Sequence, residues 1–203
     1  SGGNYKISYV TDLTGEITIR EVNVTAQTDT KNYDGDNTSA VSPIGDALQT
    51  GDTWASEGTQ TFDDKNVASG KTMTATGASI NDGNSGGNYK ISYVTDLTGE
   101  ITVRDLIVTA TGMNKVYDGT TFATVTLSTD KVAADDVTPS YTSATFDNPN
   151  GSDVGANKPV SVNGITISGD DADNYNLLNT TATTMADITP RPVTSMISVN
   201  LTE

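Results

Sequence analysis

Residues 1–20 read SGGNYKISYVTDLTGEITIR, and residues 85–104 read SGGNYKISYVTDLTGEITVR. The two stretches lie 84 positions apart and differ only at Ile19 and Val103. Chance does not produce this identity, and self-similarity at a fixed spacing is typical of repeat architectures. The fold must therefore be inferred from one repeating unit.

Weaker matches extend the repeat in both directions. The stretch Tyr33-Asp34-Gly35 recurs as Tyr117-Asp118-Gly119 at the same offset. Later matches, such as Ile80 with Ile167, lie at an offset of 87, because the second copy contains an insertion after Phe146. The register predicts two modules, 21–104 and 105–188, with residues 1–20 as the tail of a preceding repeat and 189–203 as the head of a following one.

The modules have the pattern of short β-strands. Apolar and polar residues alternate over 22–26, 71–76 and 106–110, and turn dipeptides such as Asn163-Gly164 separate such runs. No stretch keeps a helical apolar stripe over three turns. We expect an all-β fold of tandem small Ig-like β-sandwich modules, with a β-grasp-like module as the structural alternative. Because no flexible linker follows Arg104, the modules should form an elongated rod.

The composition excludes several classes of function. The 203 residues carry a net charge of −15 and contain no histidine and no cysteine. Histidine-dependent catalysis, disulfides and thiolate metal sites are therefore excluded. An acidic chain is repelled by phosphate backbones, and the apolar runs are too short to span a bilayer. We expect no enzyme, no nucleic-acid partner and no membrane insertion.

Four ordered motifs connect the second copy to a known family. They are Tyr117-Asp118-Gly119-Thr120-Thr121, residues 144–147, residues 167–175 and Ile188-Thr189-Pro190-Arg191. The pattern resembles the YDG-type tandem repeat of large bacterial surface proteins, including filamentous-haemagglutinin-like adhesins. The first copy departs from it with Val103 where the second has Pro190.

The resemblance implies an extracellular location on the bacterial surface. It also implies a structural or adhesive role as a stalk or filament, in which the partners are neighbouring repeats of the same chain, and it supplies no catalytic residue. The alternative is a module that binds a glycan or protein ligand directly.

The two Tyr-Asp-Gly stretches have two interpretations. Tyr33 and Tyr117 can anchor fold-defining turns in which Gly35 and Gly119 take positive φ, with Asp34 and Asp118 between them. The same residues can form a ligand-contacting loop. Recurrence in both copies favours the turn.

A group of acids in the second copy is a candidate calcium site. Asp170, Asp171 and Asp173 cluster, and Asp135 and Asp136 lie elsewhere in the same module. Carboxylate oxygens suit Ca²⁺, which takes six to eight ligands, but no complete calcium-binding loop is present. A solvated acidic loop is the other interpretation, and no other cofactor is expected.

The single tryptophan has no counterpart in the second copy, which has Val137-Thr138 near the matching position. Trp54 can stack on a carbohydrate as a possible ligand contact, or it can pack on the sheet, which is the commoner role.

The end segments suggest self-assembly. Residues 5–10 and 16–19 have strand patterns without the rest of their module, and an isolated hairpin is marginal in water. We expect 1–20 to pair with another molecule, for example with 189–203 of a neighbour, by strand addition.

Overall fold

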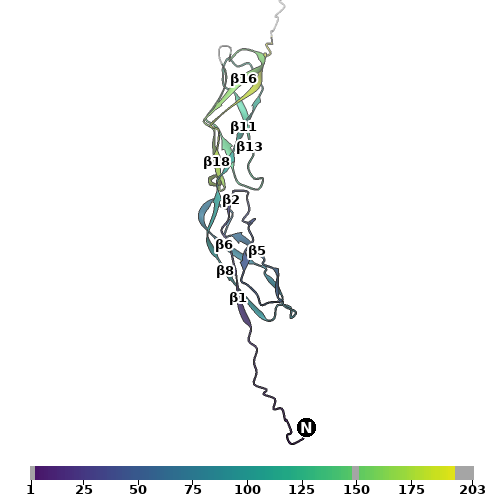
Figure 1. Cartoon of the computed structure of the whole chain (residues 1–203). Coiled ribbons are helices and arrows are strands. Elements are labelled where there is room, and N and C mark those ends of the chain that lie inside the picture. The colour runs from purple at the N-terminus through teal and green to yellow at the C-terminus, as the bar shows by residue number, and fades with distance from the viewer. Residues whose placement is uncertain (1–2, 148–150, 195–203) are drawn as a thin grey trace, which may run out of the picture. The chain divides into compact units, whose positions relative to one another are not determined.

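The protein is described by a computed structural model that covers residues 3–147 and 151–194. About half of the chain lies in β-strands (Figure 1). The described residues contain no α-helix, and the only helical turn is a 3₁₀ helix at Ala172–Asn174. The prediction of an all-β fold is confirmed. The β-grasp alternative, which needs a helix, gains no support.

The chain divides into two compact units. Unit 1 comprises 1–29, 38–63 and 71–99, and unit 2 comprises 30–37, 64–70 and 100–203. These units do not follow the expected modules at every position, because two segments of the first sequence copy, 30–37 and 64–70, belong to unit 2.

Unit 1 is built around its first strand. Its strands are β1 (Arg20–Thr25), β3 (Ile44–Gly45), β4 (Thr53–Ser56), β5 (Thr59–Phe62), β7 (Ser79–Asn81) and β8 (Tyr89–Val94), with parts of β6 (Ala68–Thr76) and β9 (Asp96–Thr102). The strand β1 lies between β3 and β8, and its six residues pair in parallel with β8, from Arg20 opposite Tyr89 to Thr25 opposite Val94. The alternating residues of β1 bury Val22 and Val24 on one face, as the period-two pattern predicts.

Buried apolar residues form the core of unit 1. Val22, Ile80 and Tyr89 make one cluster, against which Trp54 and Ile91 pack. Val24, Phe62 and Met73 are also buried in this unit. The strand β4 supplies Trp54 and pairs with β7, which supplies Ile80 directly opposite.

Unit 2 contains the remaining strands. They are β2 (Thr30–Asn32), β10 (Arg104–Leu106), β11 (Val108–Met113), β12 (Lys115–Val116), β13 (Thr124–Thr129), β14 (Thr138–Ser140), β15 (Ser143–Phe146), β16 (Gly155–Asn163), β17 (Thr166–Ser168), β18 (Tyr175–Leu177) and β19 (Thr181–Thr189). The largest sheet has the order β12-β19-β16-β15, and three two-stranded sheets pair β10 with β18, β11 with β13 and β14 with β17. Val160, Val162 and Ile188 of the large sheet are fully buried.

Parallel pairs recur in unit 2. The strand β10 pairs in parallel with β18, with Arg104 opposite Tyr175. The strand β2 pairs in parallel with the last three residues of β9, with Lys31 opposite Ile101. Thus the parallel register between Arg20 and Tyr89 in unit 1 has an equivalent in unit 2.

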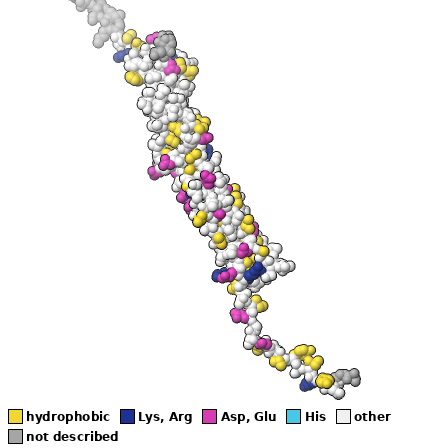
Figure 2. Space-filling view, turned by 60° about the vertical axis from the view of Figure 1, so that its left-hand side comes forward, with side chains coloured by type: hydrophobic (Ala, Val, Ile, Leu, Met, Phe, Trp, Pro, Cys, Tyr) yellow, Lys and Arg dark blue, Asp and Glu magenta, His cyan; other side chains and the backbone are white. Residues whose placement is uncertain are grey.

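The N-terminal segment differs from the sequence expectation. Residues 5–10 and 16–19 were expected to be strands, but no residue from 3 to 19 is in a strand. Tyr5, Tyr9 and Ile17 are about nine-tenths or more exposed, and hydrophobic side chains line the segment in Figure 2. These residues form no strand within the single chain, and their pairing with another molecule by strand addition stays a prediction. Residues 195–203, the rest of the proposed pairing segment, lie outside the described residues.

Candidate functional site

A buried carboxylate is the centre of a polar cluster in unit 2. Asp135 is 3% exposed and precedes β14. Its Oδ2 accepts hydrogen bonds from the hydroxyls of Tyr33, at 2.8 Å, and of Tyr175, at 2.6 Å. The two tyrosine rings meet edge to face with their centroids 5.5 Å apart. The cluster therefore joins a residue of the first sequence copy to two residues of the second.

A lysine from the first copy completes the charge balance. Lys65 Nζ lies 2.9 Å from Asp135 Oδ1 and 2.7 Å from Asp171 Oδ1. The same ammonium lies 5.8 Å from the centre of the Tyr33 ring. A buried charge is costly unless it is paired and hydrogen-bonded, and Asp135 meets both conditions.

Backbone contacts surround the cluster. Val132 N–H donates to the Tyr175 hydroxyl at 2.8 Å, and Val67 N–H donates to Asn174 Oδ1 at 2.9 Å. Asn174 is 4% exposed, and its amide also donates to Asn66 Oδ1 at 3.3 Å. Among the described residues, no buried side-chain nitrogen or oxygen lacks a hydrogen-bond partner. The segments 30–37 and 64–70 are thus held by specific polar contacts within unit 2.

The electrostatics favour the charged forms of this ion pair. Burial acts to raise the pKa of Asp135, but hydrogen bonds from Tyr175, Lys65 and Tyr33 outweigh it and hold that pKa below its ordinary value. Hydrogen bonds to Asp171 and Asp135 raise the pKa of Lys65 well above its usual range. Burial and the hydrogen bond to Asp135 raise the pKa of Tyr175 to about 12. The ion pair therefore keeps both of its charges over the neutral pH range.

Unit 1 contains a simpler version of the same arrangement. Tyr89 OH donates to Asp52 Oδ2 at 2.6 Å, and Gln49 N–H donates to the Tyr89 hydroxyl at 3.0 Å. In both units the aspartate N–H also donates to the carbonyl three residues earlier, at 3.0 Å. The tyrosine–aspartate pair is therefore a repeated element of the fold.

The two Tyr-Asp-Gly turns share their local structure. Gly35 has φ +90° and Gly119 has φ +80°. A lysine two residues before each tyrosine forms an ion pair with the aspartate, Lys31 with Asp34 at 2.8 Å and Lys115 with Asp118 at 2.9 Å. Glycine enters this backbone region without the steric cost that a Cβ brings, so it is favoured at the third position of both turns.

The surroundings of the two turns differ. Tyr33 is 1% exposed, whereas Tyr117 is 40% exposed and its hydroxyl has no hydrogen-bond partner among the described residues. A Cβ added to Gly35 would lie 2.7 Å from Val132 Cγ1, whereas one added to Gly119 would meet nothing within 4 Å. The first turn is covered by other residues of unit 2, and the second is open.

The three calcium candidates lie in or next to the 3₁₀ helix of unit 2. Asp171 is paired with Lys65 and also accepts a hydrogen bond from Asp136 N–H at 2.9 Å. Asp173 lies in the 3₁₀ helix, and Asp170 precedes it. In residues 3–147 and 151–194 no group of three or more acids is arranged to hold a metal ion. The calcium site stays a prediction, and the cation that contacts Asp171 is a lysine.

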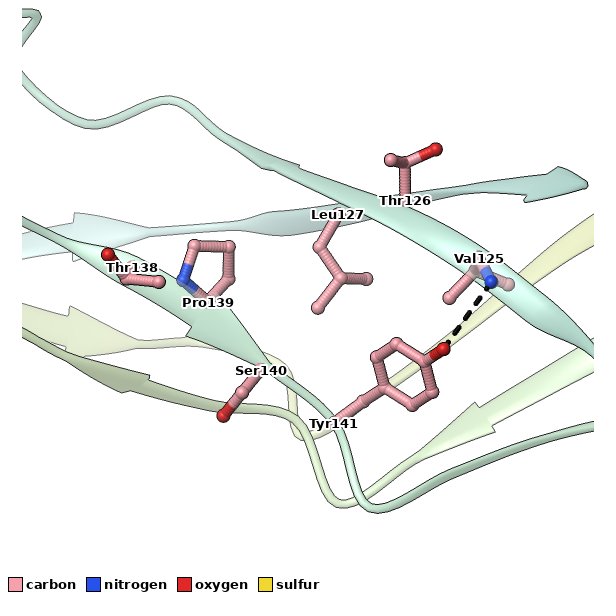
Figure 3. A pocket seen from close by; sticks show the side chains of 7 residues that line it. All are labelled: Val125, Thr126, Leu127, Thr138, Pro139, Ser140 and Tyr141. Carbon is pink, nitrogen blue, oxygen red and sulfur yellow. Dashed lines mark hydrogen bonds between the residues drawn. The ribbon is translucent and has the colours of Figure 1, made fainter.

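Trp54 packs inside unit 1. Its indole N–H donates to the Asp46 carbonyl at 3.0 Å, and its ring lies so close to Gly45 that a Cβ there would be 2.3 Å from it. Trp54 lies opposite Ile80, and Pro139 lies opposite Ile167, the residue of unit 2 that matches Ile80. Pro139 is therefore the structural counterpart of Trp54. The smaller proline borders a shallow groove of ≈ 450 Å³, into which Leu127 and Tyr141 point (Figure 3).

Sequence reasoning missed the central residue of the cluster. It grouped Asp135 with calcium candidates, and it did not single out Lys65, Tyr89 or Tyr175. One signal was available, because Asn88-Tyr89 and Asn174-Tyr175 match between copies. The partnership of Asp135 with Tyr33 spans 102 residues, and no sequence pattern indicates it.

No helix in the described part of the chain has the length and apolar character required to cross a membrane. Comparison with curated proteins found no match, and comparison with solved structures found none either. The family model of the YDG domain matches twice, at residues 18–96 and 102–184, and so covers more than half of the chain. With two tandem copies of that domain, the chain belongs to the YDG domain family.

Proposed function

We propose that this chain is a structural and adhesive repeat segment of a bacterial extracellular surface protein, in which it acts as part of a stalk or filament. In this proposal each YDG copy is a small Ig-like β-sandwich, and successive copies form an elongated rod on the cell surface. The observation that carries the proposal is the contact of Tyr33 and Lys65, from the first copy, with Asp135 of the second.

The connection between the copies supports a load-bearing role. The strand β9 ends at Thr102 and β10 begins at Arg104, so no flexible linker separates them. Two segments of the first copy are built into unit 2 through hydrogen bonds to buried residues and an ion pair. Such contacts resist separation of the copies, whereas copies joined by a flexible linker would move independently.

The order of strands also suits tension along the chain. In unit 1 the first strand, β1, is parallel to β8, close to the end of the repeat. Force applied to opposite ends of two parallel strands pulls them past each other in shear, so the hydrogen bonds between them share the load. The six-residue register of β1 with β8 is the longest parallel pairing in the described structure.

Single-molecule force spectroscopy on the full chain tests this role. In the parallel register the N–H groups of residues 90, 92 and 94 face β1, so the Ser92→Pro variant removes one hydrogen bond between β8 and β1, and unit 1 should unfold at a clearly lower force. A proline at Ile44, in the two-residue strand β3, is the matched control and should lower the force less. Equal unfolding forces for the parent and the Ser92 variant would contradict the load-bearing role.

A ligand-binding module is the second candidate function, and the groove of unit 2 favours it. Its lining combines apolar Leu127 and Pro139 with the aromatic ring of Tyr141, a surface suited to a glycan or an extended peptide (Figure 3). A glycan array and a peptide array should then show hits that the Pro139→Trp variant loses, since a tryptophan there reproduces the filled arrangement of Trp54.

A further inference from the structure

Tyr33 and Tyr117 are equivalent residues, so the contacts of Tyr33 in unit 2 indicate which groups Tyr117 can bind. Tyr33 belongs to a turn of one copy, and its hydroxyl reaches an aspartate that already accepts a hydrogen bond from the tyrosine of the next copy. Tyr117 is the equivalent donor, and it is 40% exposed. Asp52, paired with Tyr89, is the equivalent acceptor.

The residues next to this tyrosine–aspartate contact also have counterparts in the other copy. Val67 N–H donates to Asn174 in unit 2, and their counterparts in the repeat are Val154 and Asn88. Val154 is 48% exposed, and Asn88 is also exposed. A donor surface and an acceptor surface are thus both present, and each is open to solvent.

The charges allow these two surfaces to meet. Lys65 has no counterpart beside Tyr117, because the sequence holds no lysine between Phe146 and Val154. Asp171, which neutralises Lys65, is replaced by Ser85 at the equivalent position four residues before Tyr89. The donor surface lacks the cation and the acceptor surface lacks the second anion, so bringing them together buries no unpaired lysine. The Asp52 carboxylate then accepts hydrogen bonds from two tyrosine hydroxyls but has no lysine beside it, so we expect this docking to be weaker than the contact of Tyr33 in unit 2.

We propose that the surface around Tyr117 docks the Asp52–Tyr89 pair of a second copy of this chain, with the Tyr117 hydroxyl donating to the Asp52 carboxylate. A following repeat in the same polypeptide would present the same chemistry. The contact is heterologous and does not close on itself, so repeated docking gives linear, head-to-tail chains. This inference deepens the proposed stalk role, but it requires neither adhesion nor tension.

Sedimentation velocity of the full chain tests the docking. The measurement runs from micromolar concentrations to about 1 mM. Added salt, at about 0.5 M, screens the repulsion between acidic copies. We expect a weight-average sedimentation coefficient that rises with protein concentration and rises further with salt.

Two variants test the assigned atoms. Tyr117→Phe and Asp52→Asn should each weaken association about tenfold, since each removes or weakens a hydrogen bond to a charged group. Tyr9→Phe, in the exposed N-terminal segment, is the control for Tyr117→Phe, and Asp170→Asn is the charge-matched control for Asp52→Asn. Both controls should associate like the parent chain.

A photo-cross-linking experiment locates the contact. Benzoylphenylalanine in place of Tyr117 should cross-link to residues 47–52 of a second copy, and in place of Tyr33 it should cross-link within one chain to residues 132–135. A chain that stays monomeric throughout, or association that Tyr117→Phe leaves unchanged, overturns the docking. Neither result bears on the force measurement, so the failure of docking and the failure of the stalk role are distinguishable.

Discussion

Tyr33 and Tyr117 occupy the same place in two copies of one turn, yet only Tyr33 is buried. Each follows a lysine that binds the next aspartate, and each precedes a glycine of positive φ. The difference comes from what covers the turn, since Tyr33 meets Asp135 and Tyr117 meets no equivalent group among the described residues. The comparison teaches that the turn is a local structure of each copy, whereas burial of its tyrosine depends on the next tyrosine–aspartate pair.

Removing the shared acceptor should have the largest effect. Asp135→Asn leaves Lys65 without its buried partner and disturbs both tyrosine hydroxyls, so we expect unit 2 to lose about 3 kcal/mol of unfolding free energy. Asp52→Asn weakens the acceptor of the Tyr89 hydroxyl, with no buried lysine beside it, and should cost unit 1 about 1 kcal/mol.

Urea unfolding followed by circular dichroism and hydrogen exchange measures both. Trp54 is the only tryptophan and reports on unit 1 by fluorescence. Equal losses for the two variants would show that the additional donors on Asp135 contribute nothing.

Removing single hydroxyls tests the comparison directly. Tyr33→Phe should destabilise unit 2 by about 1.5 kcal/mol, because its hydrogen bond to a charged acceptor is buried. Tyr117→Phe should change stability by less than about 0.5 kcal/mol, as expected for an exposed side chain. The urea midpoint at low protein concentration measures both changes. If Tyr117→Phe lost as much stability as Tyr33→Phe, the claim that only Tyr33 is covered would be contradicted.

Alkaline pH should weaken the covered turn. The pKa of Tyr175 is raised to about 12 in the folded chain, against about 10 in an unfolded one. A raised pKa means that the folded state favours the protonated hydroxyl, so this stabilisation is complete below about pH 10 and is lost as the pH rises toward 12.

The Tyr175→Phe variant should be less stable than the parent at neutral pH and should lose less stability between about pH 10 and 12. Thermal unfolding followed by circular dichroism at a series of pH values provides the measurement. If the stabilities of the two proteins fell in parallel between about pH 10 and 12, ionisation of Tyr175 would not be the cause of the loss.

Substituting the turn glycines should give the smallest difference. Gly35→Ala and Gly119→Ala both force a side chain into the left-handed region, which costs about 1 kcal/mol. Gly35→Ala also places a Cβ against Val132, so it should cost about 1 kcal/mol more. Thermal denaturation of the two variants measures the difference, and identical losses would mean that Val132 moves aside freely.

Much of the local structure could be predicted from the sequence, but strand formation depended on partners. Residues 3–18 and 87–102 are identical, yet only the second stretch forms strands, β8 and β9. Tyr89–Val94 pairs with β1, whereas Tyr5–Val10 has no strand to pair with. Alternation therefore indicates the capacity to form a strand, and a neighbouring strand decides whether it forms.

The polar cluster was less accessible to sequence reasoning. Tyr33, Lys65 and Asp135 come from distant segments, and the Lys65–Asp171 ion pair has no counterpart elsewhere in the repeat. Repetition reveals what both copies share, such as the turn glycines and the residues Tyr89 and Tyr175. It cannot reveal a contact that the two copies make only once, because no second instance marks it.

A double-mutant cycle between Tyr33→Phe and Asp135→Asn tests the central claim most directly. The claim is that a turn of the first copy is anchored on the buried aspartate of the second. We predict a coupling free energy of about 1 kcal/mol or more between these two changes, and none between Tyr117→Phe and Asp135→Asn. Additive effects of Tyr33→Phe and Asp135→Asn, within about 0.3 kcal/mol, would contradict the claim.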